Sequence, residues 1–145
     1  YTYVEDLAER LAIYQRIAMT TKVDAIDGME SELQDRFGPL PKPAELLLYT
    51  VRARILSEEA NVVSINSRQD RLTLNLKTPT GGARAALQKA LGRGISVGNM
   101  QIRMEIDRDD DDWREELLWV LQNIVEFRER ALKLLALAGE LAPSS

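Results

Sequence analysis

The stretch NVVSINSRQDRLTLNLK (residues 61–77) decides the fold class of this chain. Its apolar residues come at every second position on either side of a polar segment: Val63, Ile65, Leu72, Leu74 and Leu76. A period of two is typical of a β-strand with one buried face. Because the polar residues 67–70 separate the two alternating runs, the stretch predicts a half-buried β-hairpin.

The sixty residues before this hairpin have a helical period instead. A first amphipathic stripe recurs at steps of three and four through Val4, Leu7, Leu11, Tyr14 and Ala18. A second helix is predicted to start with Thr21 as its N-cap and to end at Gly38, which can adopt the left-handed conformation that closes many helices. A third helix is predicted to begin at Pro43, since proline suits a first helical turn.

After the hairpin we expect a short helix, a further strand and a long final helix. Residues 83–91 are rich in alanine and end near Gly92, and apolar residues alternate from Met100 to Ile106. The final helix follows the acidic run 109–112, with an apolar stripe that continues to Leu134. The order helix, helix, helix, strand, strand, helix, strand, helix predicts a single α+β domain over residues 1–145. We expect its sheet to be antiparallel and three-stranded, with one face covered by helices.

Composition excludes several kinds of active site. The 145 residues include no cysteine and no histidine, which removes thiol chemistry, Ser-His-Asp triads and Cys or His metal sites. The net charge of -4 hides a basic centre, because residues 61–108 carry +5 while the flanks carry -4 and -5. All eight aromatic residues lie in the flanks. Nucleic-acid-binding modules commonly stack bases on aromatic rings, and residues 61–108 contain none. A solvated or partner-binding face is therefore favoured for this basic centre. The alternative is a nucleic-acid-binding module that contacts phosphates through these residues.

Four consecutive aspartates, Asp109–Asp112, raise the possibility of a site for a hard cation. Their spacing matches no calcium loop and lacks its glycine. As a helix start the run is simpler to explain, because Asp112 can cap the final helix and Glu115, three residues later, can close a capping box. We therefore expect no metal and no cofactor here. The glycines of the chain are also not arranged as a phosphate-binding motif.

A polar cluster is expected at the end of the second helix, in ELQDRFGPLP (residues 32–41). Leu33 and Phe37, four residues apart, should face the core, so that Glu32, Asp35 and Arg36 share the outer side. Carboxylates in a last helical turn oppose the helix dipole at a cost of about 0.3–1 kcal/mol each. Either Arg36 simply pairs with Glu32 on a solvated surface, or the three side chains form a contact patch for an arginine-bearing partner.

Together with YVED (residues 3–6) and RLAIYQRIA (residues 10–18), this segment resembles the C-terminal domain of bacterial transcription-repair coupling factors. The resemblance extends over about the first third of the chain. It implies a regulatory domain of a larger multidomain protein, whose ATPase and DNA translocase activities would reside in other domains, so that this chain is not itself an enzyme. The start at Tyr1 without an initiator Met agrees with an excised piece.

The resemblance also implies partners. In this family the C-terminal domain packs on a UvrB-like module of the same protein, hides the surface that binds UvrA and restrains the motor, while the whole protein acts on RNA polymerase and double-stranded DNA in excision repair. The family's contact residues then correspond to Glu32, Asp35 and Arg36. We expect a cytoplasmic location and no membrane contact, since no run approaches the ~18 apolar residues of a membrane span.

Overall fold

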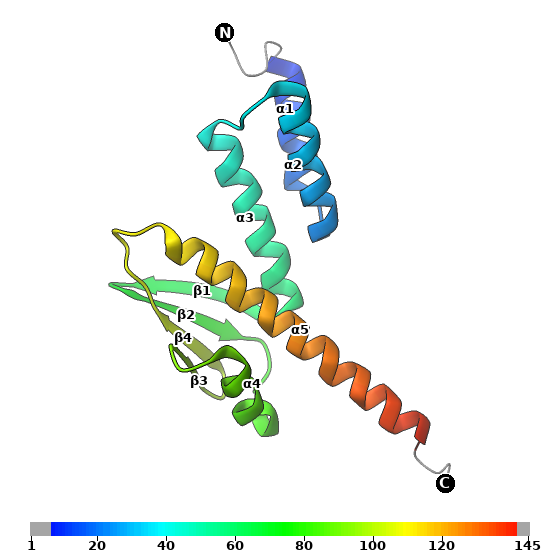
Figure 1. The fold of residues 1–145 in the computed structure, drawn as a ribbon, viewed down its shortest axis with the longest axis vertical. Helices are drawn as coiled ribbons and strands as arrows, with labels where there is room; N and C mark the ends of the chain where they lie inside the picture. The colour runs from blue at the N-terminus through cyan, green and yellow to red at the C-terminus, as the bar shows by residue number, and fades with distance from the viewer. Residues whose placement is uncertain (1–6, 142–145) are drawn as a thin grey trace. The chain divides into compact units, whose positions relative to one another are not determined.

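The computed structural model describes residues 7–141, and its sheet is formed by the middle of the chain, between residues 62 and 105 (Figure 1). Four strands form one antiparallel sheet in the order β1-β2-β4-β3. Their bounds are β1 (Val62–Arg68), β2 (Arg71–Leu76), β3 (Ile95–Val97) and β4 (Gln101–Glu105). The predicted α+β class and hairpin are confirmed.

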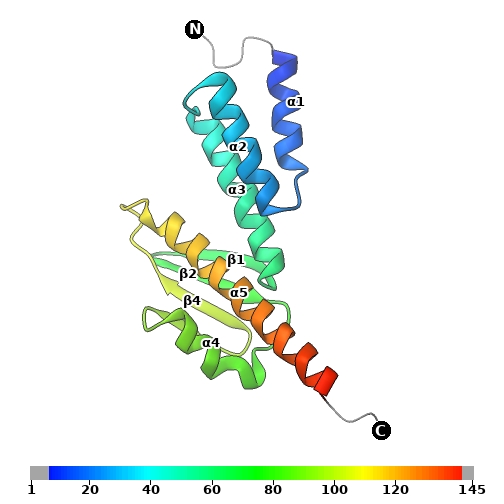
Figure 2. The same cartoon turned by 45° about the vertical axis from the view of Figure 1, so that its right-hand side comes forward.

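Five helices accompany the sheet in the described part of the chain (Figure 2). They are α1 (Leu7–Ala18), α2 (Val23–Phe37), α3 (Lys42–Glu59), α4 (Arg84–Leu91) and α5 (Asp112–Leu141), with a 3-10 turn at Gly81–Ala83 before α4. The chain divides into two compact units, Tyr1–Ile55 and Leu56–Ser145. Whether residues 1–145 act as a single domain stays a prediction. No helix within residues 7–141 is long and apolar enough to cross a bilayer.

The sheet has four strands where the sequence predicts three, because β3 was not expected. This strand has three residues, too few for an alternation to stand out from its surroundings. It pairs with β4 on one side, and on the other side the amide of Gln88 in α4 takes the place of a neighbouring strand. Gln88 donates to the carbonyl of Ile95 at 2.6 Å and accepts from the backbone N–H of Val97 at 2.9 Å.

In the first unit, the core joins all three helices through a cluster of buried residues: Ile13, Ile17, Ile26, Leu33, Leu48, Val51 and Ile55. The predicted stripe of α1 is partly wrong. Leu11 and Ala18 are exposed, whereas Ile13 and Ile17 are buried and Tyr14 packs against the cluster. Apolar residues occur on two faces of α1, and packing against the other helices selects the face that the repeat did not mark. Val4 and the side chain of Leu7 lie outside the described residues.

The two ends of α2 differ in how well they were predicted. Helix α2 begins at Val23 with Lys22 in the N-cap position and no capping side-chain bond, so the predicted Thr21 cap is wrong. The nearby polar contact belongs to the buried Thr20, whose hydroxyl donates to the carbonyl of Arg16 at 2.7 Å. Gly38 ends the helix at the predicted position, but its ψ of -159° differs from that of the predicted left-handed conformation. It has a φ of 85°, and its N–H donates to the carbonyl of Gln34.

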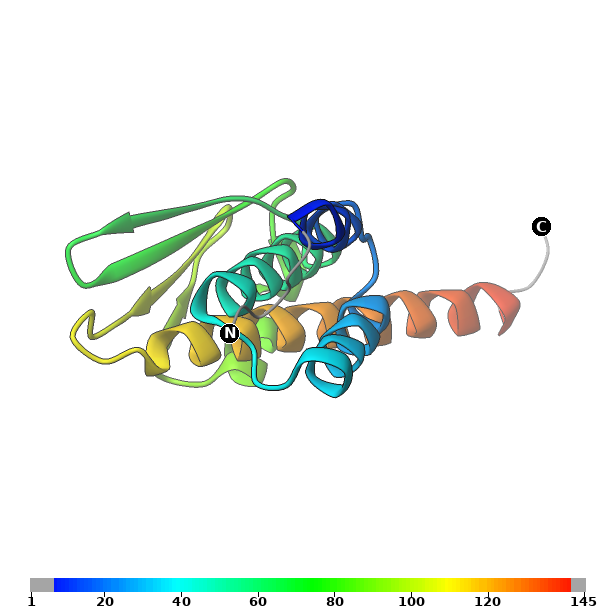
Figure 3. The same ribbon diagram turned by 90° about the horizontal axis from the view of Figure 1, so that it is seen from above.

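In the second unit, one face of the sheet forms the core against α4 and α5, which lie on the same side of it (Figure 2). The buried residues of the strands are Val62, Leu72, Leu74, Leu76, Ile95, Val97, Ile102 and Met104, and those of the two helices are Leu87, Leu91, Leu117, Val120, Leu121, Ile124 and Val125. Helix α5 crosses this face diagonally and continues past the sheet (Figure 3).

A bulge in β1 changes which of its residues face the core. Val62 pairs with Leu76 and Ser64 with Asn75, so two steps along β1 correspond to one along β2. An extra residue reverses the side-chain alternation on the bulged strand. As a result Val62 is buried and Val63, predicted for the buried face, is exposed.

The acidic run before α5 caps the helix in a different way from the prediction. Asp112 is the first helical residue, and its backbone N–H donates to Oδ1 of Asp110 at 3.1 Å. One turn earlier the N–H of Asp109 donates to Oδ1 of Asp107 at 3.0 Å. Aspartates that accept from the backbone two residues on are typical of turns that lead into a helix. The cap therefore lies two residues before the predicted Asp112.

Candidate interaction surface

The predicted patch lies on the exposed side of α2. Leu33 is buried and Phe37 packs against the core cluster, as the spacing required, and all three predicted site residues, Glu32, Asp35 and Arg36, are exposed. The apolar spacing of α2 alone is enough to place them there, since residues at steps of three and four share a face.

Glu32 lies between two guanidinium groups. Its Oε2 is 3.7 Å from Nη2 of Arg16, and its Oε1 is 3.7 Å from Nη1 of Arg36. The three side chains are about half exposed, at 46% for Glu32, 56% for Arg16 and 52% for Arg36. At this distance the pairs are too long for good hydrogen bonds, and ion pairs in water contribute about 0–1 kcal/mol. The Glu32 carboxylate is therefore held weakly and can leave these two arginines for another partner.

Arg16, the partner from α1, is the residue that sequence reasoning missed. It follows from the corrected face of α1, because once Ile13 and Ile17 are buried, Arg16 lies beside α2. The Thr20 hydroxyl bonded to the Arg16 carbonyl helps to hold this end of α1 in place. The only signal in the sequence was the second set of apolar residues in α1, which competed with the more regular stripe.

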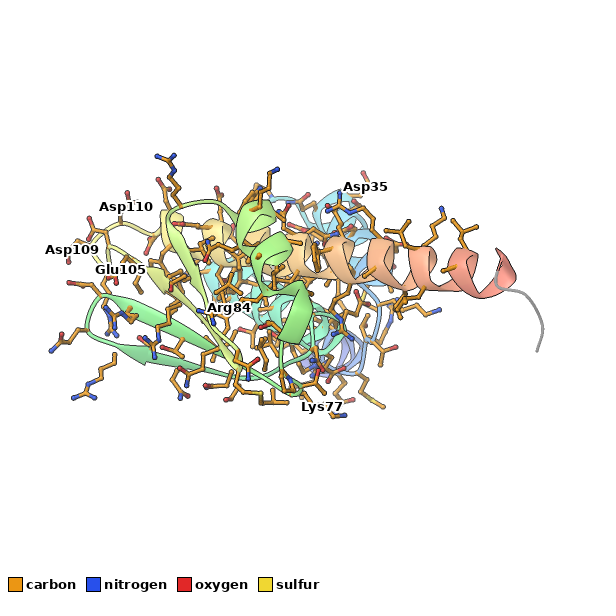
Figure 4. All side chains as sticks on the ribbon, turned by 90° about the horizontal axis from the view of Figure 1, so that it is seen from below. Asp35, Lys77, Arg84, Glu105, Asp109 and Asp110 are labelled. Atoms are coloured by element: carbon orange, nitrogen blue, oxygen red, sulfur yellow. The ribbon has the colours of Figure 1, made fainter. Side chains whose placement is uncertain are left out.

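Asp35 differs from Glu32 in its surroundings. It is exposed and forms no ion pair within the part of the chain that the structure describes. Figure 4 shows its side chain at the edge of α2. Next to it, the guanidinium carbon of Arg36 lies 5.1 Å from the centroid of the Phe37 ring, within the range of a cation-π contact. Asp35 is thus the carboxylate of the patch that is open to a new partner.

The charged residues border a small depression on this surface. Arg16, Glu32 and Arg36 line it together with the apolar residues Ile13, Ile17, Met29 and Leu33. We define the α2 patch as Arg16, Glu32, Asp35 and Arg36. It offers two carboxylates, two guanidinium groups and an apolar floor, which suits a polar contact with another protein surface.

A second polar surface lies on the face of the sheet that points away from α4 and α5. Cross-strand rows place Arg68 beside Arg71 and Thr73 beside Arg103 on this face. A depression of about 690 Å³ is lined by polar residues: Asn66, Arg68, Gln69, Asp70, Arg71, Thr73, Gln101, Arg103 and Glu105. Arg71 is already engaged, since its Nε donates to Oε1 of Glu105 at 3.1 Å. Glu105, Asp109 and Asp110 gather at one end of the sheet (Figure 4), which lowers its positive potential.

Comparison with known proteins identifies the family. The family model of the TRCF domain matches residues 1–87, which is more than half of the chain. The chain belongs to the TRCF domain family. The match includes α1, α2, α3 and the hairpin, and therefore the whole α2 patch.

Relatives with this domain are transcription-repair coupling factors, which agrees with the predicted resemblance. The chain is 23% identical to the transcription-repair-coupling factor of Bacillus subtilis over 141 residues, and the match includes 90% of this chain and 12% of the relative. It is 40% identical to the transcription-repair-coupling factor of Haemophilus influenzae over 65 residues, or 45% of this chain and 6% of the relative. The chain thus spans only a small part of the relatives' length.

A solved structure supports the fold of the TRCF domain described above. The crystal structure of the C-terminal domain of a transcription-repair coupling factor has a TM-score of 0.68 to this chain at 20% identity. The similarity includes 88% of this chain and 86% of the solved chain. At this level of identity the likeness concerns the arrangement of the helices and strands.

Proposed function

We propose that this TRCF domain is a regulatory latch within a transcription-repair coupling factor. In the closed state the α2 patch binds a UvrB-like module of the same protein, which masks the surface for UvrA and restrains the ATP-driven DNA translocase. Binding of RNA polymerase, DNA or nucleotide elsewhere in the protein favours the open state, because those ligands have a higher affinity for it. The chemistry itself takes place in other domains.

The observation that carries this proposal is the loose hold on Glu32. A latch must be stable when closed and must still open, and couplings of this kind are typically about 1–3 kcal/mol. Charge-assisted bonds from carboxylates to arginine are strong enough for that purpose. When the latch closes, Glu32 gives up two contacts at 3.7 Å for one contact with the partner. When the latch opens, Glu32 regains those two contacts, so opening costs little free energy.

The surroundings of the two carboxylates rank their roles in the latch. Asp35 engages a basic group of the partner without giving up an ion pair among the described residues. Glu32 must first leave Arg16 and Arg36, which compete with the partner for it. Asp35 is therefore the main anchor, Glu32 the secondary one, and Arg16 a competitor that favours the open state.

The test replaces the two anchors in the full-length protein, as Glu32→Ala with Asp35→Ala. We expect tighter UvrA binding and faster ATP hydrolysis in the absence of DNA, each by about 5-fold or more for a coupling of 1–3 kcal/mol. Adding Arg36→Ala should change the result little further. If neither quantity rises, the domain is not a latch that acts through α2.

A matched control removes two carboxylates elsewhere. Glu58 and Glu59 are exposed in the last turn of α3, so Glu58→Ala with Glu59→Ala makes the same change in net charge without touching the patch. UvrA binding and ATP hydrolysis should stay at the wild-type level in this variant. A rise of equal size would mean that overall charge, and not the patch, controls the protein.

The outer face of the sheet supports a second candidate, binding to the phosphates of DNA. Its arginines, amides and hydroxyls are the groups that contact phosphate oxygens without reading sequence. Against it stand the Arg71–Glu105 pair and the acidic end of the sheet. A salt titration of DNA binding distinguishes the two candidates, because phosphate contacts weaken steeply with salt. Binding that is lost in Arg68→Ala with Arg103→Ala would support this candidate.

A further inference from the structure

Met19 is more exposed than any other large apolar residue in the described part of the chain. Its exposed fraction is 81%, against 51% for Leu11 and 52% for Leu46, the other exposed large apolar residues of the first unit. Single exposed apolar residues are common on protein surfaces, so exposure alone does not indicate a contact. What distinguishes Met19 is its place beside the α2 patch and the way in which its backbone is held.

The backbone on both sides of Met19 is held by hydrogen bonds. Arg54 donates at 3.0 Å to the carbonyl of Ala18 and at 3.0 Å to the carbonyl of Thr20. Thr20 itself is buried, and its hydroxyl donates to the carbonyl of Arg16 at 2.7 Å. Met19 therefore lies in a turn between two anchored residues, with its side chain in water. A side chain on an ordered turn loses less conformational freedom on binding than one on a loose loop, which favours affinity.

Met19 continues the face of α1 that carries Arg16. Its N–H donates to the carbonyl of Gln15 at 3.1 Å, so the helical pattern of hydrogen bonds extends one residue past Ala18. Residues three apart on a helix are neighbours, with about 5–6 Å between their Cβ atoms. Nη2 of Arg16 is in turn 3.7 Å from Oε2 of Glu32 in α2. Met19 therefore adds an apolar group directly beside the charged α2 patch.

We propose that Met19 is the apolar anchor of the contact that the α2 patch makes with its partner. This inference rests on the proposed latch and adds the chemistry of the partner surface. The α2 patch is charged and about half exposed, as is typical of the rim of an interface, and a stable contact also needs a desolvated apolar group. Methionine is enriched at interfaces, because its unbranched thioether side chain adapts to irregular gaps. The partner surface therefore has an apolar pocket for one thioether side chain, next to basic groups for Asp35 and Glu32.

Substitutions at Met19 in the full-length protein separate an apolar contact from mere exposure. Met19→Gln makes the side chain polar at similar length, so it should weaken the closed state and raise UvrA binding by about 3-fold or more, within the range of such couplings. Met19→Leu keeps an apolar side chain of similar volume and should leave UvrA binding close to the wild-type value. Met100→Gln is the matched control, since Met100 is an exposed methionine of the second unit, at 41%.

The outcomes distinguish this inference from the latch on which it rests. If Glu32→Ala with Asp35→Ala raises UvrA binding and Met19→Gln does not, the latch stands and Met19 is not its anchor. Equal increases in Met19→Gln and Met100→Gln, or in Met19→Gln and Met19→Leu, would also overturn the inference. If none of these variants raises UvrA binding, both the latch and the anchor are wrong.

Oxidation by hydrogen peroxide measures how well Met19 is covered without any change at that residue. Peroxide transfers one oxygen atom to the thioether sulfur and leaves as water, so the rate depends on access to the sulfur. In the full-length protein, Met19 should form sulfoxide at least about 3-fold more slowly in the wild type than in Glu32→Ala with Asp35→Ala, as followed by peptide mass spectrometry. Met100 should react at the same rate in both proteins. Equal rates at Met19 in the two proteins, together with increased UvrA binding by the double variant, would overturn the inference.

Discussion

Helix α2 contributes carboxylates to two clusters of arginine and carboxylate side chains, and the two clusters have opposite arrangements of charge. Toward α3, the Arg52 side chain is only 19% exposed, and its guanidinium reaches two carboxylates, Asp27 and Glu30, with Nη2 at 3.2 Å from Oε2 of Glu30. In the α2 patch the carboxylate of Glu32 is shared by two exposed guanidiniums, each at 3.7 Å. One cluster fixes a cation between two anions, and the other leaves an anion between two cations.

The difference shows that the same chemical groups can either stabilise the fold or form a contact with a partner protein. A guanidinium that has little access to water and is hydrogen-bonded to two carboxylates has few alternatives to its native partners. Nearby, Arg54 has a similar fastening role, since it donates at 3.0 Å to the carbonyls of Ala18 and Thr20 between α1 and α2. A carboxylate surrounded by water keeps alternatives, and so the α2 patch can accept a partner.

The largest effect expected from this comparison is on stability. Arg52→Ala should lower the free energy of unfolding by about 1–3 kcal/mol, because it removes charge-assisted bonds to two carboxylates. Urea unfolding followed by far-ultraviolet circular dichroism measures this loss. Arg93→Ala is the control, since Arg93 is exposed in the loop after α4. A loss no larger than that of the control would mean that the Arg52 cluster is as weak as the α2 patch.

The next effect separates the two carboxylates of the α2 patch. In the full-length protein, Asp35→Asn should increase UvrA binding by about 3-fold or more and Glu32→Gln by less, within the total coupling of 1–3 kcal/mol. The reason is that Glu32 already has two partners to return to, whereas Asp35 has none among the described residues. Isothermal titration with UvrA gives both values. The reverse order would show that Glu32 is the main anchor.

The comparison also explains which features could be predicted from the sequence. The alternation of Leu72, Leu74 and Leu76 and the spacing of Leu33 and Phe37 are local patterns, and the structure confirms them. Features that depend on contacts between distant segments could not be predicted. The edge strand β3 needs the Gln88 amide from α4.

Arg16 is a second example, because its position depends on the choice between two apolar faces of α1. The sequence marks the face with Leu11, whereas packing selects the face with Ile13 and Ile17. Glu32, Asp35 and Arg36 lie where the pattern places them, and their role as partner-binding residues stays a prediction. The pattern alone could not rank them, since their ion pairs depend on how α1 packs beside α2.

A smaller effect is expected for Arg16, and its sign differs from that of the anchors. Arg16→Gln removes one of the two cations that compete for Glu32, so the closed state gains and UvrA binding should fall by about twofold, as for one exposed ion pair. Glutamine keeps much of the length of the side chain. Titration of the full-length variant with UvrA measures the change. An increase, as for Asp35→Asn, would place Arg16 in direct contact with an acidic group of the partner.

The smallest effect is on the stability of the α2 patch itself. Glu32→Gln removes two ion pairs of half-exposed side chains, and screening by water and salt limits their value, so we expect a change within about 0.5 kcal/mol in urea unfolding. Glu32 lies before the last turn of α2, so its removal changes the interaction with the helix dipole little. A loss as large as that of Arg52→Ala would mean that Glu32 fastens α1 to α2. In that case the patch would be part of the fold, and the regulatory change would have to begin at Asp35 alone.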